Sequence, residues 1–232
     1  MEILAQHYQE VRDRITRAAQ ACGRDPGDVQ LLAVSKTFGV EAIRVVAACG
    51  QRDFGENYIQ EGVDKIRQLR ADPDMPPLVW HCIGPIQSNK TRLVAEHFDW
   101  VHSIDRLKIA ERLSEQRPAE MADLQVCLQV NIDGGDTKSG VAPAELIELA
   151  QAVVALPRLR LRGLMTIPDP VPDDRAMLAV HRRTAALWRE LQSRLPGVPL
   201  DVLSMGMTAD LALAIQAGST MVRIGTAIFG QR

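Results

Sequence analysis

The feature that most constrains the fold of this chain is the alternation of eight short apolar runs with longer amphipathic stretches along its whole length. Most of the runs are continuously apolar, which is typical of strands that are buried on both faces of a parallel sheet. The second and fourth runs are very short, but the regular spacing favours a strand at each position. The eight runs are residues 31–34, 53–54, 78–83, 100–102, 124–130, 159–165, 200–203 and 221–224.

The stretches between the runs have the periodicity of helices. Within residues 175–195, one broad apolar face is formed by Met177, Val180, Thr184, Leu187, Leu191 and Leu195. A similar face, in a helix that precedes the first strand, is formed by Ile3, Val11, Ile15 and Ala18. Steps of three and four residues place such side chains on one side of a helix.

Eight strand–helix units in about 200 residues lie at the lower end of the range for a (β/α)₈ barrel. We therefore predict an α/β fold, a single TIM-type (β/α)₈ barrel with an extra N-terminal helix, in which residues 1–232 form one domain. A doubly wound open sheet is the alternative, because periodicity does not distinguish the two. The proline-rich segments 72–77 and 168–174 are interpreted as surface connections within the domain.

Composition excludes several classes of protein. A formal net charge of −2 provides no field that would attract nucleic acid or an anionic membrane. The four cysteines are widely spaced and form no Cys-x-x-Cys pair, which argues against a zinc site or a disulfide framework. No run approaches the ~18 apolar residues of a membrane span. We expect a cytoplasmic monomer with no metal and no nucleic-acid or membrane partner.

Unusual polar and glycine residues gather where the predicted strands end. In a barrel of this type the chemistry lies at these C-terminal ends, because the loops that follow the strands converge there. The segments concerned are 35–37 (SKT), 55–57 (GEN), 84–90 (GPIQSNK), 133–140 (DGGDTKSG), 204–208 (SMGMT) and 223–226 (RIGT).

Lys36 is the most distinctive of the five lysines, because it directly follows a buried strand. Burial favours the neutral amine, which is the form that attacks an aldehyde to give an imine. The structural alternative is a lysine that simply reaches water from the mouth of the strand. Lys65 and Lys108 lie within helical patterns and are interpreted as solvated surface charges.

The loops after the seventh and eighth strands are the usual phosphate site of this architecture. Ser204 offers a hydroxyl, Gly206 permits a close approach of the backbone, and Gly225 and Thr226 supply further amides and a second hydroxyl. Ordinary turn and capping chemistry is the alternative, with Thr208 as a helix N-cap. Two such turns on adjacent strands favour a phosphate site.

Arg223 lies in the end of the eighth strand, beside the predicted phosphate loops. Its guanidinium does not lose its proton, so it would donate a hydrogen bond to a pyridine nitrogen and leave that nitrogen unprotonated. An unprotonated ring is a weaker electron sink. The alternative is an arginine that pairs with a carboxylate.

Seven segments together carry a resemblance to a known family: 33–37 (AVSKT), 54–58 (FGENY), 81–90 (HCIGPIQSNK), 138–140 (KSG), 162–165 (RGLM), 203–207 (LSMGM) and 221–230 (MVRIGTAIFG). With them the chain resembles the pyridoxal phosphate homeostasis proteins, small relatives of the alanine racemase barrel, over nearly its whole length. The resemblance implies an alanine-racemase-like barrel of PLP fold type III. It also implies a Schiff base of pyridoxal 5′-phosphate (PLP) on Lys36.

The resemblance further implies intracellular PLP homeostasis and delivery, with apo PLP-dependent enzymes as recipients and no robust catalysis. The residues expected to bind the cofactor are Lys36, Asn57, Ser204, Gly206, Arg223, Gly225 and Thr226, and none is assigned a catalytic role. Asn57 could instead cap the helix that follows it. His81 is interpreted as a satisfied core residue. The chain departs from the family at Phe38-Gly39, where the usual residues are lysine and proline, so a second lysine is missing from this position.

Two enzymatic alternatives remain open. An amino-acid racemase would share the barrel and the lysine, but racemisation needs acid–base groups on both faces of the substrate. The chain has only two tyrosines, Tyr8 in the N-terminal helix and Tyr58 after the second strand. A Schiff-base aldolase without a cofactor would use the phosphate loops to hold a sugar phosphate.

Overall fold

The computed structural model describes residues 2–135 and 139–231. Eight parallel strands form a closed barrel in the order of the sequence. The strands are β1 (Gln30–Val34), β2 (Asp53–Glu56), β3 (Val79–Cys82), β4 (Trp100–Ile104), β5 (Leu124–Gln129), β6 (Leu159–Met165), β7 (Val202–Ser204) and β8 (Met221–Ile224). The α-helices of the described residues are α1 (Glu2–Ala21), α2 (Val40–Ala48), α3 (Ile59–Arg70), α4 (Thr91–His97), α5 (Leu107–Gln116), α6 (Leu146–Val154), α7 (Asp174–Arg194), α8 (Leu211–Ala217) and α9 (Thr226–Phe229).

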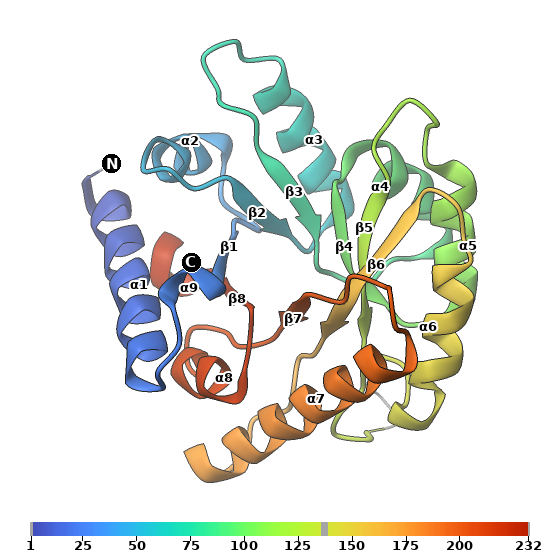
Figure 1. Ribbon diagram of the computed structural model, residues 1–232. Coiled ribbons are helices and arrows are strands. Elements are labelled where there is room, and N and C mark those ends of the chain that lie inside the picture. The colour runs from blue at the N-terminus through green and yellow to red at the C-terminus, as the bar shows by residue number, and fades with distance from the viewer. Residues whose placement is uncertain (1, 136–138, 232) are drawn as a thin grey trace.

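The predicted barrel is confirmed. The sheet closes because β1 pairs in parallel with β8, with Leu32 opposite Arg223, and this pairing excludes the open doubly wound sheet. Both short runs are strands and are longer than predicted, since β2 extends to Glu56 and β4 to Ile104. The helices surround the strands, which occupy the centre of the view in Figure 1.

The extra N-terminal helix α1 lies along one side of the barrel, next to α8 and α9 (Figure 1). It buries Tyr8, Val11, Ile15 and Ala19. The prediction that Ile3 belongs to this face is wrong, because Ile3 lies in the first turn of the helix and is 67% exposed.

Two arginines, Arg14 of α1 and Arg24 just after it, attach this part of the chain to the loop after β7 and to the connection between α8 and β8. Arg14 donates to the carbonyl oxygen of Thr208 over 2.9 Å, and Arg24 donates to the carbonyl oxygens of Ile215 and Ser219 over 2.8 Å. The helix therefore supports the loop that follows β7.

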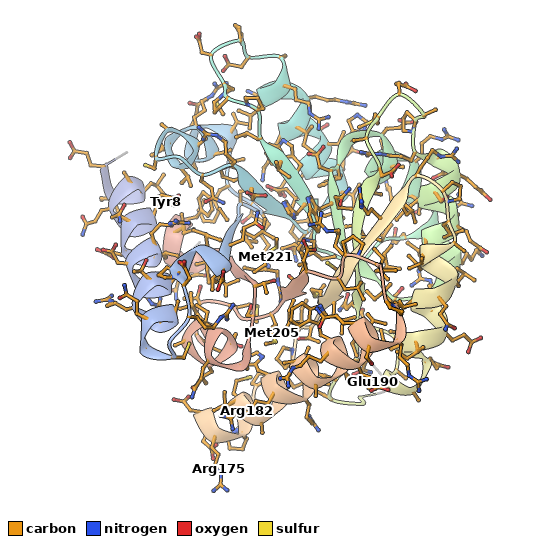
Figure 2. The ribbon with its side chains drawn as sticks, viewed as in Figure 1. Tyr8, Arg175, Arg182, Glu190, Met205 and Met221 are labelled. Carbon is orange, nitrogen blue, oxygen red and sulfur yellow. The ribbon has the colours of Figure 1, made fainter. Side chains whose placement is uncertain are left out.

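The core has two layers. The larger layer fills the space between the strands and the helices. A smaller cluster fills the barrel interior and consists of Leu32, Val34, Ile83, Cys127, Met165, Val202 and Met221, with Trp100 packed against it. Figure 2 shows Met221 near the centre of the molecule. Because side chains alternate between the two faces of a strand, interior and exterior positions are every second residue.

The helix predicted over 175–195 is α7, which buries Val180, Thr184 and Leu191 of the predicted face. Arg175, Arg182 and Glu190 of the same helix are exposed, and Figure 2 shows them along it. Among the described residues, no helix is both long enough and apolar enough to cross a membrane.

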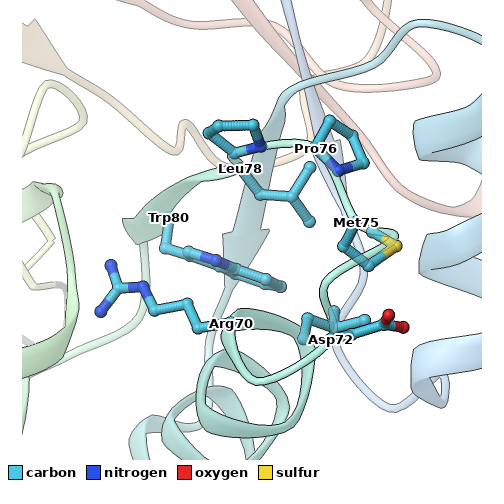
Figure 3. A pocket seen from close by; sticks show the side chains of 8 residues that line it. Arg70, Asp72, Met75, Pro76, Leu78 and Trp80 are labelled. Atoms are coloured by element: carbon cyan, nitrogen blue, oxygen red, sulfur yellow. The ribbon is translucent and has the colours of Figure 1, made fainter.

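The segments 72–77 and 168–174 are connections between α3 and β3 and between β6 and α7, as predicted. The first encloses a hollow of about 200 Å³, and Figure 3 shows Met75, Leu78 and Trp80 around it. This connection leads into the N-terminal end of β3, so the hollow lies away from the strand ends at which chemistry is expected.

Candidate functional site

A pocket of about 680 Å³ opens at the C-terminal ends of the strands. It is large enough for a cofactor, since such sites usually measure about 300–1,000 Å³. Of the seven residues predicted from the sequence, five line this pocket: Lys36, Asn57, Arg223, Gly225 and Thr226. The structure thus brings together residues from the ends of β1, β2 and β8. Ser204 and Gly206 lie behind its wall.

Lys36 follows β1 on the interior side of the barrel. Val34 belongs to the interior cluster, and strand alternation then directs Ser35 outward and Lys36 inward. The Lys36 side chain is half-buried and makes no hydrogen bond or ion pair with another described residue. Its amine is therefore available to a ligand in the pocket.

The backbone around Lys36 is held by a buried polar cluster that the sequence interpretation missed. Lys65 of α3 donates to Glu56 over 2.9 Å, to Glu61 over 2.6 Å and to the carbonyl oxygen of Ser35 over 2.9 Å. The interpretation of Lys65 as a solvated surface charge is wrong, because only 8% of its side chain is exposed. Lys108 is exposed, as expected.

Both neighbours of Lys36 are tied to this cluster. The Ser35 hydroxyl donates to Glu56 over 2.6 Å, and the amide of Thr37 donates to Glu61 over 2.5 Å. The second bond holds Thr37 at a φ of 69°, a left-handed conformation that non-glycine residues seldom adopt. The cluster thus fixes the direction in which the chain leaves β1.

Arg223 is only 4% exposed and is held by three hydrogen bonds. It donates to the carbonyl oxygen of Ser204 over 2.7 Å, to the Ser204 hydroxyl over 2.9 Å and to the carbonyl oxygen of Thr166 over 2.8 Å. Among the described residues no carboxylate forms an ion pair with it, so the alternative of a carboxylate partner is not observed. Burial lowers the pKa of Arg223 to about 10, which still leaves it charged at neutral pH.

Ser204 does not line the pocket, although its position at the end of β7 suggests that it would. Its side chain is fully buried, and its hydroxyl contacts Arg223 and Nδ1 of His102, the latter over 2.9 Å. The hydroxyl is thereby occupied beneath the pocket. Ser204 holds Arg223 and is not part of the surface that a ligand would touch.

The loop after β7 forms part of the pocket wall with Met207, Thr208 and Ala209. Gly206 has a φ of 95°, and a Cβ atom there would lie 2.4 Å from the Cβ atom of Ala214 in α8. This close approach explains the glycine. The carbonyl oxygen of Gly206 accepts from the amide of Arg223 over 3.0 Å, so the loop is fixed to β8.

Thr208 is not the N-cap of the next helix. Helix α8 begins at Leu211, and Asp210 is the residue that precedes it. One carboxylate oxygen of Asp210 accepts from the amide of Met207 over 2.7 Å, and the other contacts Nε2 of His181 over 2.8 Å. Burial raises the pKa of Asp210, but these hydrogen bonds outweigh it and leave the pKa below its usual value.

The second loop begins at Gly225, which precedes α9. A Cβ atom at Gly225 would lie 3.2 Å from the carbonyl oxygen of Val34, so the glycine allows β8 to end close against β1. Thr226 is exposed and lines the pocket. The two loops thus present backbone and hydroxyl groups to the same space.

Asn57, after β2, also lines the pocket, and it is not a helix cap. Helix α3 begins at Ile59, and no side chain caps its first turn. The Asn57 Oδ1 atom is buried and lacks a hydrogen-bond partner among the described residues. A buried polar atom without a partner is costly, so this amide indicates a polar ligand in the pocket.

The residues of the pocket fit PLP, with a free amine, an unsatisfied amide, a buried guanidinium and two loops rich in backbone donors. Comparisons with known proteins point the same way. The model of the alanine racemase N-terminal domain family matches residues 7–232. Pyridoxal phosphate homeostasis proteins of Vibrio cholerae and Escherichia coli K12 are 56% and 55% identical over 232 residues, which cover 100% of this chain and 98% of each relative. This chain belongs to the pyridoxal phosphate homeostasis protein family.

The resemblance drawn from the motifs is therefore confirmed. A solved member of this homeostasis protein family, PipY of Synechococcus elongatus with PLP bound, is 36% identical, with a TM-score of 0.85. That match covers 98% of this chain and 100% of PipY. An alanine racemase of Corynebacterium glutamicum has the same barrel at 20% identity, with a TM-score of 0.69. The match covers 100% of this chain but 62% of the racemase.

Three other sequence interpretations concern residues outside the pocket lining. His81 is a core residue, as expected, because it is fully buried and both ring nitrogens have partners. Lys138, in one of the family-like motifs, lies outside the described residues. The two tyrosines do not line the pocket, since Tyr8 is buried in α1 and Tyr58 is 54% exposed elsewhere.

Proposed function

We propose that this chain captures PLP reversibly on Lys36, retains it in the pocket above the barrel and releases it to apo forms of PLP-dependent enzymes. The observation that carries the proposal is the Lys36 amine, which has no partner among the described residues and shares a pocket with Arg223. The PLP bound to PipY supports it. The proposal treats residues 1–232 as one domain that acts as a cytoplasmic monomer.

Each part of the pocket has a role in this proposal. When bound, PLP supplies an aldehyde that an amine captures as an imine, together with a phosphate and a pyridine nitrogen. Lys36 provides the amine. The loops around 207–209 and 225–226 provide amides and hydroxyls for the phosphate. Asn57 offers an amide with unused hydrogen-bonding capacity to the polar edge of the ring.

Arg223 determines the electronic character of the site. Its three hydrogen bonds to the protein hold it in one position, and it remains a donor because it keeps its proton. A donor that faces the pyridine nitrogen leaves the ring neutral, and a neutral ring stabilises a carbanion poorly. This feature favours retention of PLP over turnover of amino acids.

Among the described residues, the rest of the pocket also presents no histidine, cysteine, tyrosine or carboxylate of the kind that racemisation needs. Two-sided proton transfer requires an acid–base group opposite the lysine. In the described part of the chain no tyrosine lines the pocket. Amino-acid racemisation is the second candidate, and the barrel shared with alanine racemase is the observation in its favour.

A spectrum of the purified protein with PLP tests the capture step. We expect visible absorbance from the imine in the wild type and its loss in Lys36→Ala. Borohydride reduction and peptide mapping should place the label on Lys36. A label mainly on Lys90 would overturn the assignment. Pyridoxal without phosphate should bind far more weakly, and equal affinity would show that the two loops do not bind phosphate.

Transfer and turnover assays separate the two candidates. Loaded protein is mixed with apo PLP-dependent enzymes, and activation of these enzymes is followed. In parallel, exchange of the α-proton for deuterium is measured on L- and D-amino acids. Transfer without exchange supports the carrier. Exchange at roughly 1 s⁻¹ or faster, within the range of ordinary enzymes, would support the racemase.

A further inference from the structure

A chain of polar side chains crosses the interior of the barrel beside the apolar cluster. Its members come from five strands and face inward by strand alternation. They are Asp53 of β2, His81 of β3, His102 of β4, Ser204 of β7 and Arg223 of β8. A buried polar group is costly unless it is satisfied, so a chain of this length inside a core requires an explanation.

Each pair of neighbouring groups in this polar chain lies within hydrogen-bonding distance. Oδ1 of Asp53 lies 3.0 Å from Nε2 of His81, and Nδ1 of His81 lies 2.9 Å from Nε2 of His102. Nδ1 of His102 lies 2.9 Å from the Ser204 hydroxyl, which accepts from Arg223 over 2.9 Å. Both histidines and the serine are fully buried. The chain is therefore continuous, and its two histidines and its serine are shielded from water.

The two ends of the chain open at opposite mouths of the barrel. Arg223 lines the cofactor pocket at the C-terminal ends of the strands. Asp53 is the first residue of β2 and lines a separate hollow of about 730 Å³, bordered by α1 and by the segment 49–53. The Asp53 side chain is 20% exposed. Solvent thus reaches one end, and the cofactor would reach the other.

When both rings are neutral, the Asp53 end sets the direction of the hydrogen bonds. An ionised Asp53 only accepts, so His81 donates from Nε2 and its Nδ1 accepts from Nε2 of His102. Nδ1 of His102 then accepts from the Ser204 hydroxyl, whose oxygen accepts from Arg223. Both histidines are neutral in this arrangement, and burial lowers the pKa of His102 well below its usual value, in agreement with it.

Few other groups around His81 and His102 could take up a proton. Trp100 stacks on His81, and Arg162 lies over Trp100 while it is paired with Asp201. The thiol of Cys127, from β5, is neutral, because burial raises its pKa to about 12. Strand β1 contributes only apolar side chains to the interior cluster.

We propose that His81 and His102 are positioning residues that hold Arg223 through Ser204, so that protonation at the Asp53 end weakens the retention of PLP at the other end. The inference rests on the proposed function. A proton gained by His81 makes its Nδ1 a donor, which forces His102 to accept on Nε2 and to donate from Nδ1. Ser204 then accepts from both His102 and Arg223, and its own hydrogen loses its acceptor.

The arrangement of the histidines can be tested without any cofactor. Nitrogen-15 NMR of the imidazole rings distinguishes the two neutral tautomers from each other and from the charged form. At pH 7.5 we expect both His81 and His102 as neutral Nε2–H tautomers. An Nδ1–H tautomer or a charged ring at either position would overturn the proposed direction of the chain. This result does not depend on PLP binding, so it separates the inference from the proposed function.

Retention of PLP tests the consequence of the chain. The variants are His102→Leu, which cuts the chain beside Ser204, and Asp53→Ala, which removes its partly exposed end. The control is Cys127→Ala, an interior change outside the chain. Imine absorbance gives the affinity for PLP, and transfer to an excess of an apo enzyme gives the release rate between pH 5.5 and 8.5.

We expect His102→Leu to bind PLP about tenfold more weakly at pH 7.5, because the Ser204 hydroxyl that holds Arg223 loses its buried acceptor. Asp53→Ala should flatten the rise in release rate that the wild type shows as the pH falls, and Cys127→Ala should behave as the wild type does. If His102→Leu does not fold, Asp53→Ala decides. Wild-type affinity and a wild-type pH profile in Asp53→Ala or in a folded His102→Leu would refute the inference. Failure of the wild type to bind PLP would refute the proposed function.

Discussion

Replacement of Lys65 by methionine tests whether Lys65 and Glu56 contribute to stability as a buried ion pair or contribute as little as a surface pair does. Methionine keeps the length of the lysine side chain but removes its charge. In the wild type, Glu56 is fully buried and its Oε2 atom has no partner among the described residues. Burial raises the pKa of Glu56, and Lys65 is the strongest opposing influence. The variant would leave this carboxylate with the Ser35 hydroxyl alone.

Removal of one partner from a buried ion pair costs about 3–5 kcal/mol, because the other charge stays buried without compensation. Glu61 adds little to this cost, since its side chain is 32% exposed and water can solvate it. We therefore expect Lys65→Met to lower the free energy of unfolding by about 3–5 kcal/mol at pH 7.5. Lys65→Met/Glu56→Gln should recover most of this loss, because no buried charge remains.

Urea unfolding followed by tryptophan fluorescence measures these differences, since Trp80 is buried in the core. The pH dependence provides a second check. Glu56 has a raised pKa in the folded state, so its neutral form is favoured there and the penalty should shrink as the pH falls from 7.5 to 5. A loss below about 1 kcal/mol, or a double variant no more stable than the single one, would refute the ion-pair interpretation.

Three further predictions concern other parts of the barrel. Gly163→Ala should cost about 3 kcal/mol or more in urea unfolding, because the added Cβ atom would lie 1.7 Å from the carbonyl oxygen of Val202. His181→Ala should weaken PLP binding in a spectroscopic titration, because it frees the Asp210 side chain that holds the loop after β7. The folded-state pKa of Asp210 is lowered, so its contribution to stability is present above the unfolded pKa and is lost as the pH falls through the folded value. Thermal unfolding between pH 6 and 3 should show this loss, and Asp210→Asn should abolish it.

The sequence predicted the barrel well, because eight buried strands leave a pattern that periodicity detects. It also indicated that Lys36 and Arg223 lie at the strand ends, where both line the pocket, since a charge on a buried strand is conspicuous. Their contacts with PLP stay a prediction. Lys65 was misinterpreted because its neighbours in α3 are polar, and only the tertiary structure shows that Glu56 faces the same helix. Periodicity locates a side chain on a helix but does not identify the partner across the layer.

Ser204 was misplaced for a related reason. A serine at a strand end beside a glycine suggests a phosphate ligand, but strand alternation leaves its hydroxyl below the pocket, against His102. The partnership joins β4 and β7, which are 102 residues apart in the chain at these positions. No local pattern reports a contact over that separation, and the sequence interpretation of His81 as a satisfied core residue was correct without revealing the partner.

Strand β2 contributes one side chain to each of the two polar systems that support the site. Alternation sends Glu56 outward to Lys65, which fixes the backbone around Lys36, and sends Asp53 inward to the chain that ends at Arg223. The backbone around Lys36 and the side chain of Arg223 are thus each held by a separate buried network. Groups that are already in place reduce the entropy lost on binding, so they favour tight capture of PLP. Catalysis would need, in addition, a second acid–base group across from Lys36, and neither network presents one to the pocket. Rigid support combined with one-sided chemistry fits the reversible carrier that we propose.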